Sequence, residues 1–209
     1  MAILQLRVKY HIFPVDFSRF TRLAPKAANR SLDIGSGPVP RNPFDAKIVY
    51  GVDIRSWDVN ENVKKCSLGN ENIPFPENYF DSVTAFDVLE HIPRVASNDG
   101  EISFPFISTM NEIWRVLKVD GLFYSETPCY PMKEAFQDPT HVNIMTEDTL
   151  RLYFAEKAWA RIYGFEGSFE LLDEGWKASH YFCVLRKSSR FRLISIISIM
   201  PVIEFHPQF

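Results

Sequence analysis

The sequence lacks most features that mark secreted or membrane-spanning proteins. It has three cysteines, Cys66, Cys129 and Cys183, and their spacing is not that of a metal site. An odd cysteine count argues against a disulfide framework and favours a reducing compartment, the cytoplasm. No apolar run reaches the ~18 residues that a membrane-spanning helix needs. The first ten residues carry Arg7 and Lys9 and have no apolar centre, so we expect no signal peptide.

The sequence also lacks a surplus of basic residues. It has 23 Lys and Arg against 26 Asp and Glu, which gives a formal net charge of -3. Domains that bind nucleic acid are usually basic, so we expect no nucleic-acid partner. The hydrophobic fraction of 46% is that of an ordinary globular protein, and the length favours one domain with a sizeable core.

Glycine is scarce, with nine residues, but Gly35 and Gly37 lie in one loop directly after an apolar run that contains Asp33. A second apolar run, 49–54, contains Asp53. Each run predicts a short buried strand. Glycine lets a charged ligand approach the backbone closely, and an acid about 20 residues further along is suited to binding the hydroxyls of a ribose. Together these features predict a nucleoside-cofactor site at the carboxyl edge of a parallel sheet.

The type of nucleoside follows from the rest of the loop. In the dinucleotide fingerprint G-x-G-x-x-G/A the third position packs a helix on the strand, but here Pro40 takes that place. This argues against NAD or FAD and makes an NAD-dependent oxidoreductase the weakest alternative. The motif G-x-x-x-x-G-K-[ST] does not occur. An aminoacyl nucleoside fits better, with Asp33 facing its ammonium group directly or through water.

Further motifs follow in order along the chain. They are a Pro-Phe-Pro segment leading into an apolar run (72–86), the segment Asp87-Val88-Leu89-Glu90-His91-Ile92, and a helix end followed by a strand (112–123). With the glycine loop and Asp53, the chain over residues 30–187 resembles the class I S-adenosylmethionine-dependent methyltransferases. The resemblance implies an enzyme with S-adenosyl-L-methionine as cofactor and a small molecule as methyl acceptor.

The resemblance also implies an α/β, Rossmann-like methyltransferase fold. Its sheet is mostly parallel and seven-stranded, with an antiparallel final strand and helices on both faces. Periodicity predicts helices over 104–117 and 146–163 and a closing antiparallel pair over 169–172 and 180–186. Prolines interrupt the first crossover, so its helix should be shortened. These prolines are Pro38, Pro40 and Pro43.

The ends of the chain lie outside the resemblance. We expect an N-terminal extension over 1–30, a methyltransferase domain over 31–187 and a C-terminal tail over 188–209. Apolar residues alternate over 3–12, which predicts an extra strand or a subunit contact in a homodimer. The tail is basic and then apolar. Packing on the core or on a second subunit is favoured there over contact with a membrane surface.

The resemblance transfers cofactor contacts to matching positions. Phe86 and Asp87 end the fourth core strand, where the methyl group should be displayed. The family often has an acid near the adenine amino group, and here Asn70 would offer its amide oxygen instead. The cofactor-binding candidates are Asp33, Gly35, Ser36, Gly37, Asp53, Ile54, Asn70, Phe86 and Asp87.

Asp87, Glu90 and His91 allow two interpretations. Their spacing is similar to the Glu-x-x-Glu-His of some quinone-pathway O-methyltransferases, where it binds a divalent ion, and such a donor set suits Mg²⁺ or Mn²⁺. Many methyltransferases carry Glu-His here without metal, as a structural pair or as part of the substrate pocket. We favour the second interpretation and expect no metal. A metal-assisted quinone-type enzyme remains the alternative.

His141 is the candidate general base, because it lies in a loop after the strand predicted over 122–127, and this loop should cross the mouth of the site. Asp138 is placed to orient it, and Tyr130 and Tyr10 are reserve candidates. The segment 137–143 also looks like that of methyltransferases encoded with surface-glycan biosynthesis. We therefore expect the acceptor to be a hydroxyl, or less favourably an amine, of a sugar, nucleotide-sugar or glycan precursor. A non-catalytic partner subunit with the same fold is the competing hypothesis.

Overall fold

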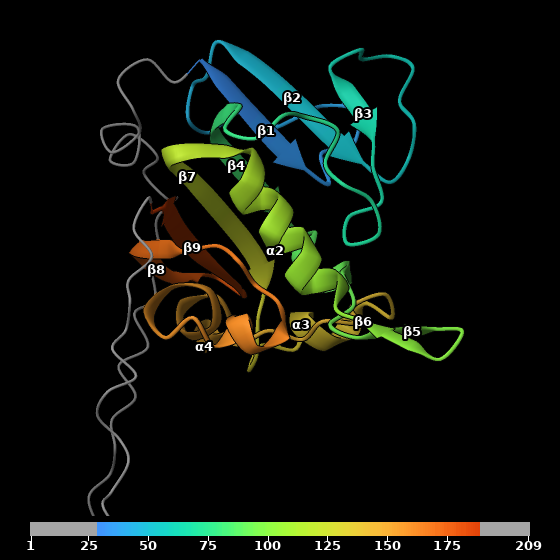
Figure 1. The fold of residues 1–209 in the computed structure, drawn as a ribbon, viewed down its shortest axis with the longest axis vertical. Helices are drawn as coiled ribbons and strands as arrows, with labels where there is room; N and C mark the ends of the chain where they lie inside the picture. The colour runs from blue at the N-terminus through green and yellow to red at the C-terminus, as the bar shows by residue number, and fades with distance from the viewer. Residues whose placement is uncertain (1–28, 189–209) are drawn as a thin grey trace, which may run out of the picture.

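The computed structural model describes residues 29–188, which form a twisted seven-stranded sheet with helical segments around it (Figure 1). The strand order is β3-β2-β1-β4-β7-β9-β8. The strands are β1 (Arg30–Ile34), β2 (Ile48–Asp53), β3 (Val63–Lys65), β4 (Phe80–Phe86), β7 (Leu117–Pro128), β8 (Phe169–Lys177) and β9 (His180–Lys187). Neighbours from β3 to β7 pair in parallel, and β9 is antiparallel to both β7 and β8. This confirms the predicted mostly parallel sheet.

Short helical segments and one hairpin complete the described residues. The helical segments are η1 (Leu89–His91), α2 (Pro105–Val116), α3 (Glu134–Gln137), α4 (Glu147–Leu150), η2 (Arg151–Glu156) and η3 (Trp159–Tyr163). The hairpin pairs β5 (Ala96–Asn98) with β6 (Glu101–Ser103). Figure 1 shows α2 crossing one face of the sheet, while α3 and α4 lie beyond the carboxyl ends of the parallel strands.

Helix α2 forms as the sequence predicts. Pro105 stands in its first turn, where a missing N–H costs nothing. Met110 and Ile113 are completely buried against strand residues of the main core. The helix ends at Val116, and Leu117 is already extended at the start of β7. Its apolar stripe is therefore what holds this helix on the sheet.

The first crossover, residues 35–47, is a loop of turns and bends. The side chain of Asn42 and the backbone of Ala46 hold this loop together. Nδ2 of Asn42 donates to the Ala46 carbonyl, and Oδ1 of Asn42 accepts the Ala46 N–H, both at 2.9 Å. Phe44 packs in a second apolar cluster with Leu122, Tyr124 and Val184. The prolines thus leave this crossover without a helix, and the Phe44 side chain covers this part of the sheet instead.

The predicted single helix over 146–163 is wrong. Thr146 does cap it, through a capping box with Thr149. The chain then widens into a π turn over 151–156 and breaks at Ala158, whose φ is 49°. In an unbroken α-helix Ala160 would point about 120° away from Phe154. The break lets both side chains face the core, where both are buried.

Two predictions fall on residues that the structure does not describe. These are the N-terminal strand over 3–12, with the reserve base Tyr10, and the C-terminal tail over 188–209, of which only Ser188 is described. Within residues 29–188, no helix is long and apolar enough to cross a membrane.

Candidate active site

The glycine loop follows β1 directly and adopts a conformation that glycine favours. Gly35 and Gly37 have φ angles of 66° and 59°. The N–H groups of Gly35 and Ser36 donate to the carbonyl of Val52 in β2, at 2.8 and 3.2 Å. A Cβ added at Gly35 would lie 2.5 Å from the side chain of Val88, whereas one at Gly37 would meet nothing within 4 Å. Gly35 therefore permits close packing, and the backbone at Gly37 faces open space where a ligand can approach.

Asp53 ends β2 and ties the glycine loop to that strand. Its Oδ2 accepts the N–H of Gly37 and its Oδ1 accepts the N–H of Arg55, each at 2.9 Å. Each carboxylate oxygen keeps a lone pair for a further donor. These two acceptor oxygens fit the two hydroxyls of a ribose, which would donate to them. Ser36 lies in the same loop and donates its hydroxyl to the Gly37 carbonyl, while Ile54 is exposed beside it.

Asp33 is buried at the end of β1 and already has two partners. Its Oδ1 accepts the hydroxyl of Thr84 at 2.7 Å and its Oδ2 accepts the N–H of Arg41 at 2.8 Å. Burial raises the pKa of Asp33 to about 6, against the lowering effect of these two hydrogen bonds. Asp33 thus links β1, β4 and the first crossover. The proposed contact with a ligand ammonium stays a prediction.

Two further positions transferred from the family lie outside the glycine loop, Asn70 in a connection and Phe86 at a strand end. Asn70 is exposed in the connection between β3 and β4, and its Nδ2 donates to the Ser67 hydroxyl. Its amide oxygen is thus oriented by that bond. Phe86 ends β4, with the guanidinium of Arg41 4.5 Å above its ring.

Asp87 lies directly after β4 in a left-handed conformation, with φ 53°. Its Oδ1 lies 2.9 Å from Nε2 of His180, the first residue of β9. Burial acts to raise the pKa of Asp87, but the hydrogen bond and charge of His180, with Arg41 and Lys177, hold it below its usual value. The bond to Asp87 in turn raises the pKa of His180. His180 was not among the predicted site residues, although it opens β9, which pairs antiparallel with β7 and so places it at the carboxyl edge of the parallel strands.

Glu90, His91 and His141 come together as a group that we call the Glu-His-His cluster. One ligand atom from each of the three lies within 4.8 Å of the others. The two imidazole rings meet edge to face, with centroids 4.9 Å apart. Glu90 is 1% exposed, and its Oε2 accepts the Thr127 hydroxyl at 2.7 Å. Burial raises the pKa of Glu90. His141, which the sequence placed in a separate role, thus joins Glu90 and His91.

His141 is held in one orientation by the loop before it. Its Nδ1 lies 3.2 Å from the carbonyl oxygen of Ala135, which can only accept, so Nδ1 carries the proton and Nε2 has the free lone pair. Asp138 lies 4.0 Å from that Nε2, while its other oxygen binds Thr140. The structure therefore gives Ala135, rather than Asp138, the main orienting contact. Tyr130 is 55% exposed nearby in sequence.

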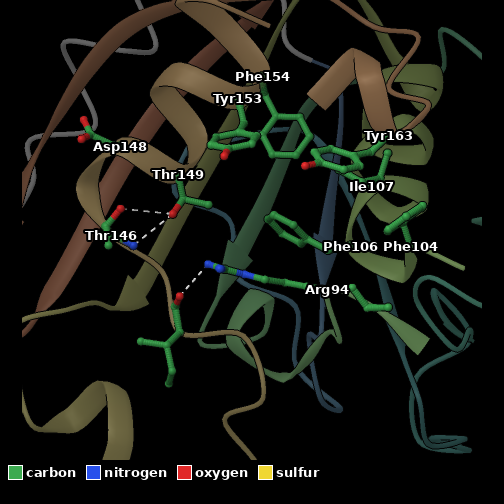
Figure 2. Close-up of a pocket in the computed structure, with 12 residues that line it drawn as sticks. Arg94, Phe104, Phe106, Ile107, Thr146, Asp148, Thr149, Tyr153, Phe154 and Tyr163 are labelled. Carbon is green, nitrogen blue, oxygen red and sulfur yellow. Dashed lines mark hydrogen bonds between the residues drawn. The ribbon is translucent and has the colours of Figure 1, made fainter. Parts of the chain in front are cut away.

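A cavity of about 450 Å³ opens beside the start of α2 (Figure 2). Its walls are mostly aromatic and aliphatic, with Arg94, Thr146, Asp148 and Thr149 as polar residues. Arg94 is fixed by hydrogen bonds of 2.6 Å to Oδ1 of Asn143 and to the Ile144 carbonyl. Segment 140–146 therefore supplies part of the cavity wall, and it also supplies His141 to the Glu-His-His cluster. The glycine loop does not line this cavity.

Comparisons with known proteins agree with this fold. A family model described as a methyltransferase domain matches residues 10–162. A putative methyltransferase from Bacillus halodurans is 16% identical, with a TM-score of 0.53 over 84% of this chain and 100% of that one. A SAM-dependent methyltransferase from Archaeoglobus fulgidus is 18% identical, with a TM-score of 0.52 over 82% and 92%. No curated protein sequence matches the chain.

One further solved structure is a Haloferax volcanii putative methyltransferase in complex with the Trm112 methyltransferase activator. It is 11% identical, with a TM-score of 0.51 over 83% of this chain and 89% of that one. At these identities the solved structures establish the fold, and the family model covers most of the chain. The chain belongs to the methyltransferase-domain family and is a class I enzyme with S-adenosylmethionine as its cofactor.

Proposed function

We propose that the protein methylates a hydroxyl group of a small polar acceptor, a sugar, nucleotide-sugar or glycan precursor. The observation that carries the hydroxyl assignment is the orientation of His141, whose Nδ1 faces a carbonyl and whose Nε2 is left as a proton acceptor, in a side chain that clusters with Glu90. The resemblance of segment 137–143 to enzymes encoded with surface-glycan biosynthesis supports the sugar class. A hydroxyl is a poor nucleophile at neutral pH, so its methylation needs a group that removes the proton.

Residues of two strand ends would hold the cofactor. The Asp53 carboxylate takes the ribose hydroxyls, and the backbone around Gly37 lets the ligand approach. Asn70 would accept from the adenine amino group. S-adenosylmethionine supplies an electrophilic methyl carbon when bound. The chain contributes alignment of the acceptor oxygen and removal of its proton by His141.

A second acceptor class, an aromatic hydroxyl compound of quinone type, is favoured by the cavity beside α2. Phe106, Phe154 and Tyr163 are among its walls, and flat rings pack well on such side chains (Figure 2). The variant Ile107→Trp should narrow the cavity. It should raise KM for an aromatic acceptor and leave a sugar acceptor unaffected.

The test is a methyl-transfer screen with S-adenosylmethionine labelled in the methyl group. The panel contains nucleotide-sugars, phosphorylated amines and quinone precursors. The proposal expects label in a sugar hydroxyl product with the wild-type protein and its loss with His141→Ala. Tyr130→Phe is the matched control and should keep turnover. Label found only in an amine, or equal turnover without His141, would remove the hydroxyl assignment.

A further inference from the structure

We propose that the Glu-His-His cluster of Glu90, His91 and His141 binds a divalent first-row transition-metal ion such as Zn²⁺ or Mn²⁺. One ligand atom of each residue lies within 4.8 Å of the other two. Ligands about 2.1 Å from a tetrahedral ion lie about 3.4 Å apart. The three side chains therefore need to approach one another by at most about 1.4 Å, which small side-chain rotations provide.

Glu90 gives an independent indication of a missing partner. The residue is 1% exposed, and its Oε1 is buried without a hydrogen-bond partner among the described residues. Its other oxygen, Oε2, is occupied by the Thr127 hydroxyl. A buried carboxylate oxygen without a partner costs free energy, and a cation between the carboxylate and the two imidazoles would remove that cost.

Both histidines are oriented as metal ligands usually are. Such histidines donate the N–H of one ring nitrogen to a carbonyl or carboxylate and present the other nitrogen to the ion. Nδ1 of His141 lies 3.2 Å from the Ala135 carbonyl, and Nδ1 of His91 lies 3.2 Å from the Thr140 carbonyl and 3.0 Å from its hydroxyl. Each ring therefore keeps Nε2 for a ligand.

The proposed ligand set differs from the Asp87, Glu90 and His91 set considered from the sequence. Asp87 is not among the three clustered residues, and its carboxylate pairs with His180 at 2.9 Å. His141 takes the third place. The inference therefore departs from the expectation of a metal-free site, which rested on the many methyltransferases that carry Glu-His at this position without metal.

The donor set and the exposure define the kind of ion. Two imidazoles with one carboxylate favour zinc-like or manganese-like ions over Ca²⁺, which prefers oxygen ligands, and over Mg²⁺, which keeps its waters. Three protein ligands leave a coordination position open, as in catalytic sites. His91 is exposed and Glu90 is buried, so the cluster extends from the surface to a buried carboxylate.

This inference deepens the proposed function and rests on it for its chemical role. A cation at the cluster lowers the pKa of a hydroxyl that it coordinates. With the ion bound, His141 acts as a ligand and the proton of the coordinated hydroxyl is released to solvent. Without the ion, His141 accepts that proton itself.

The experiment measures ion binding directly, in full-length protein without cofactor or acceptor. The protein is stripped with a chelator, dialysed and titrated calorimetrically with ZnCl₂, MnCl₂ and MgCl₂. We expect saturable binding of one ion per chain, with Zn²⁺ tightest and Mg²⁺ weakest. His141→Ala and Glu90→Gln should lower affinity by more than about 100-fold, and Thr127→Val by about 10–100-fold.

The controls separate this cluster from other possibilities. Asp87→Asn and His180→Gln should bind the ion as wild type does. If Glu90→Gln fails to fold, shown by circular dichroism, His141→Ala carries the test because His141 lies nearer the surface. Absence of saturable binding, wild-type affinity in His141→Ala, or loss of binding in Asp87→Asn would each overturn the inference. Methyl transfer that persists in ion-free protein would overturn the ion's role and leave the proposed function intact.

Discussion

The proposed cofactor side and acceptor side of the site differ in how far the chain itself pairs their polar groups. On the cofactor side, the carboxylates of Asp33 and Asp53 already accept hydrogen bonds from the chain itself. On the acceptor side, Glu90 keeps an unpartnered oxygen, and His91 and His141 each keep a ring nitrogen. The cofactor half is thus shaped in advance by its own backbone, whereas the acceptor half holds groups in reserve for a ligand or a proton.

The largest effect should come from the acceptor half. His141→Ala should lower turnover by roughly 10²–10⁴-fold, because the group that receives or activates the hydroxyl proton is lost. The measurement is steady-state methyl transfer at saturating cofactor. Near-normal turnover in a folded His141→Ala protein would show that the two halves do not divide the chemistry in this way.

The glycine loop offers a test of how strongly the cofactor half is shaped in advance. Gly35→Ala should destabilise the protein by about 2–5 kcal/mol, since it combines left-handed strain with a clash on Val88. Gly37→Ala should cost only about 1–2 kcal/mol of strain, because its Cβ would meet open space. Chemical denaturation measures both. Equal losses of stability would mean that packing at Gly35 does not hold the loop.

Asp53 should carry most of the side-chain contribution to cofactor affinity. Asp53→Ala should weaken S-adenosylmethionine binding by about 1.5–3 kcal/mol, through loss of charge-assisted hydrogen bonds to the ribose. Asn70→Ala should cost less, about 0.5–1.5 kcal/mol, because a neutral amide makes a weaker bond. Calorimetric titration compares the two. A larger effect at Asn70 would move the ribose contact away from β2.

The smallest effect should be on stability and should come from the ion pair of Asp87 and His180. The raised pKa of His180 adds stability below about pH 6.5 that is lost as pH rises through its folded pKa. The lowered pKa of Asp87 adds stability above about pH 3.8 that is lost as pH falls through its folded pKa. His180→Gln should therefore destabilise most between about pH 4 and 6.5, by less than about 1 kcal/mol because Asp87 is half exposed. A loss of stability that is constant from pH 4 to 9 would contradict the ion pair.

The same contrast explains what could be predicted from the sequence. Asp33, Gly35, Gly37 and Asp53 lie on strand ends that follow from local patterns, so their neighbourhood was predictable. The partners of Asp87 depend on a strand almost a hundred residues away, and no local pattern identifies them.

Local sequence patterns also fail to identify the Glu-His-His cluster and the break in the helix. The meeting of His141 with Glu90 depends on the path of a loop without regular periodicity. Likewise, the periodic pattern over 146–163 correctly located the helical segment but not its break. The left-handed turn at Ala158 is imposed by packing of Phe154 and Ala160 rather than by a local signal.

The central claim is that cofactor binding and acceptor chemistry are carried by separate halves of the site. Calorimetric titration of Asp53→Ala and His141→Ala with S-adenosylmethionine tests it most directly. The account predicts weakened binding in Asp53→Ala and wild-type affinity in His141→Ala. Wild-type affinity in Asp53→Ala, or an equal loss in both variants, would contradict it.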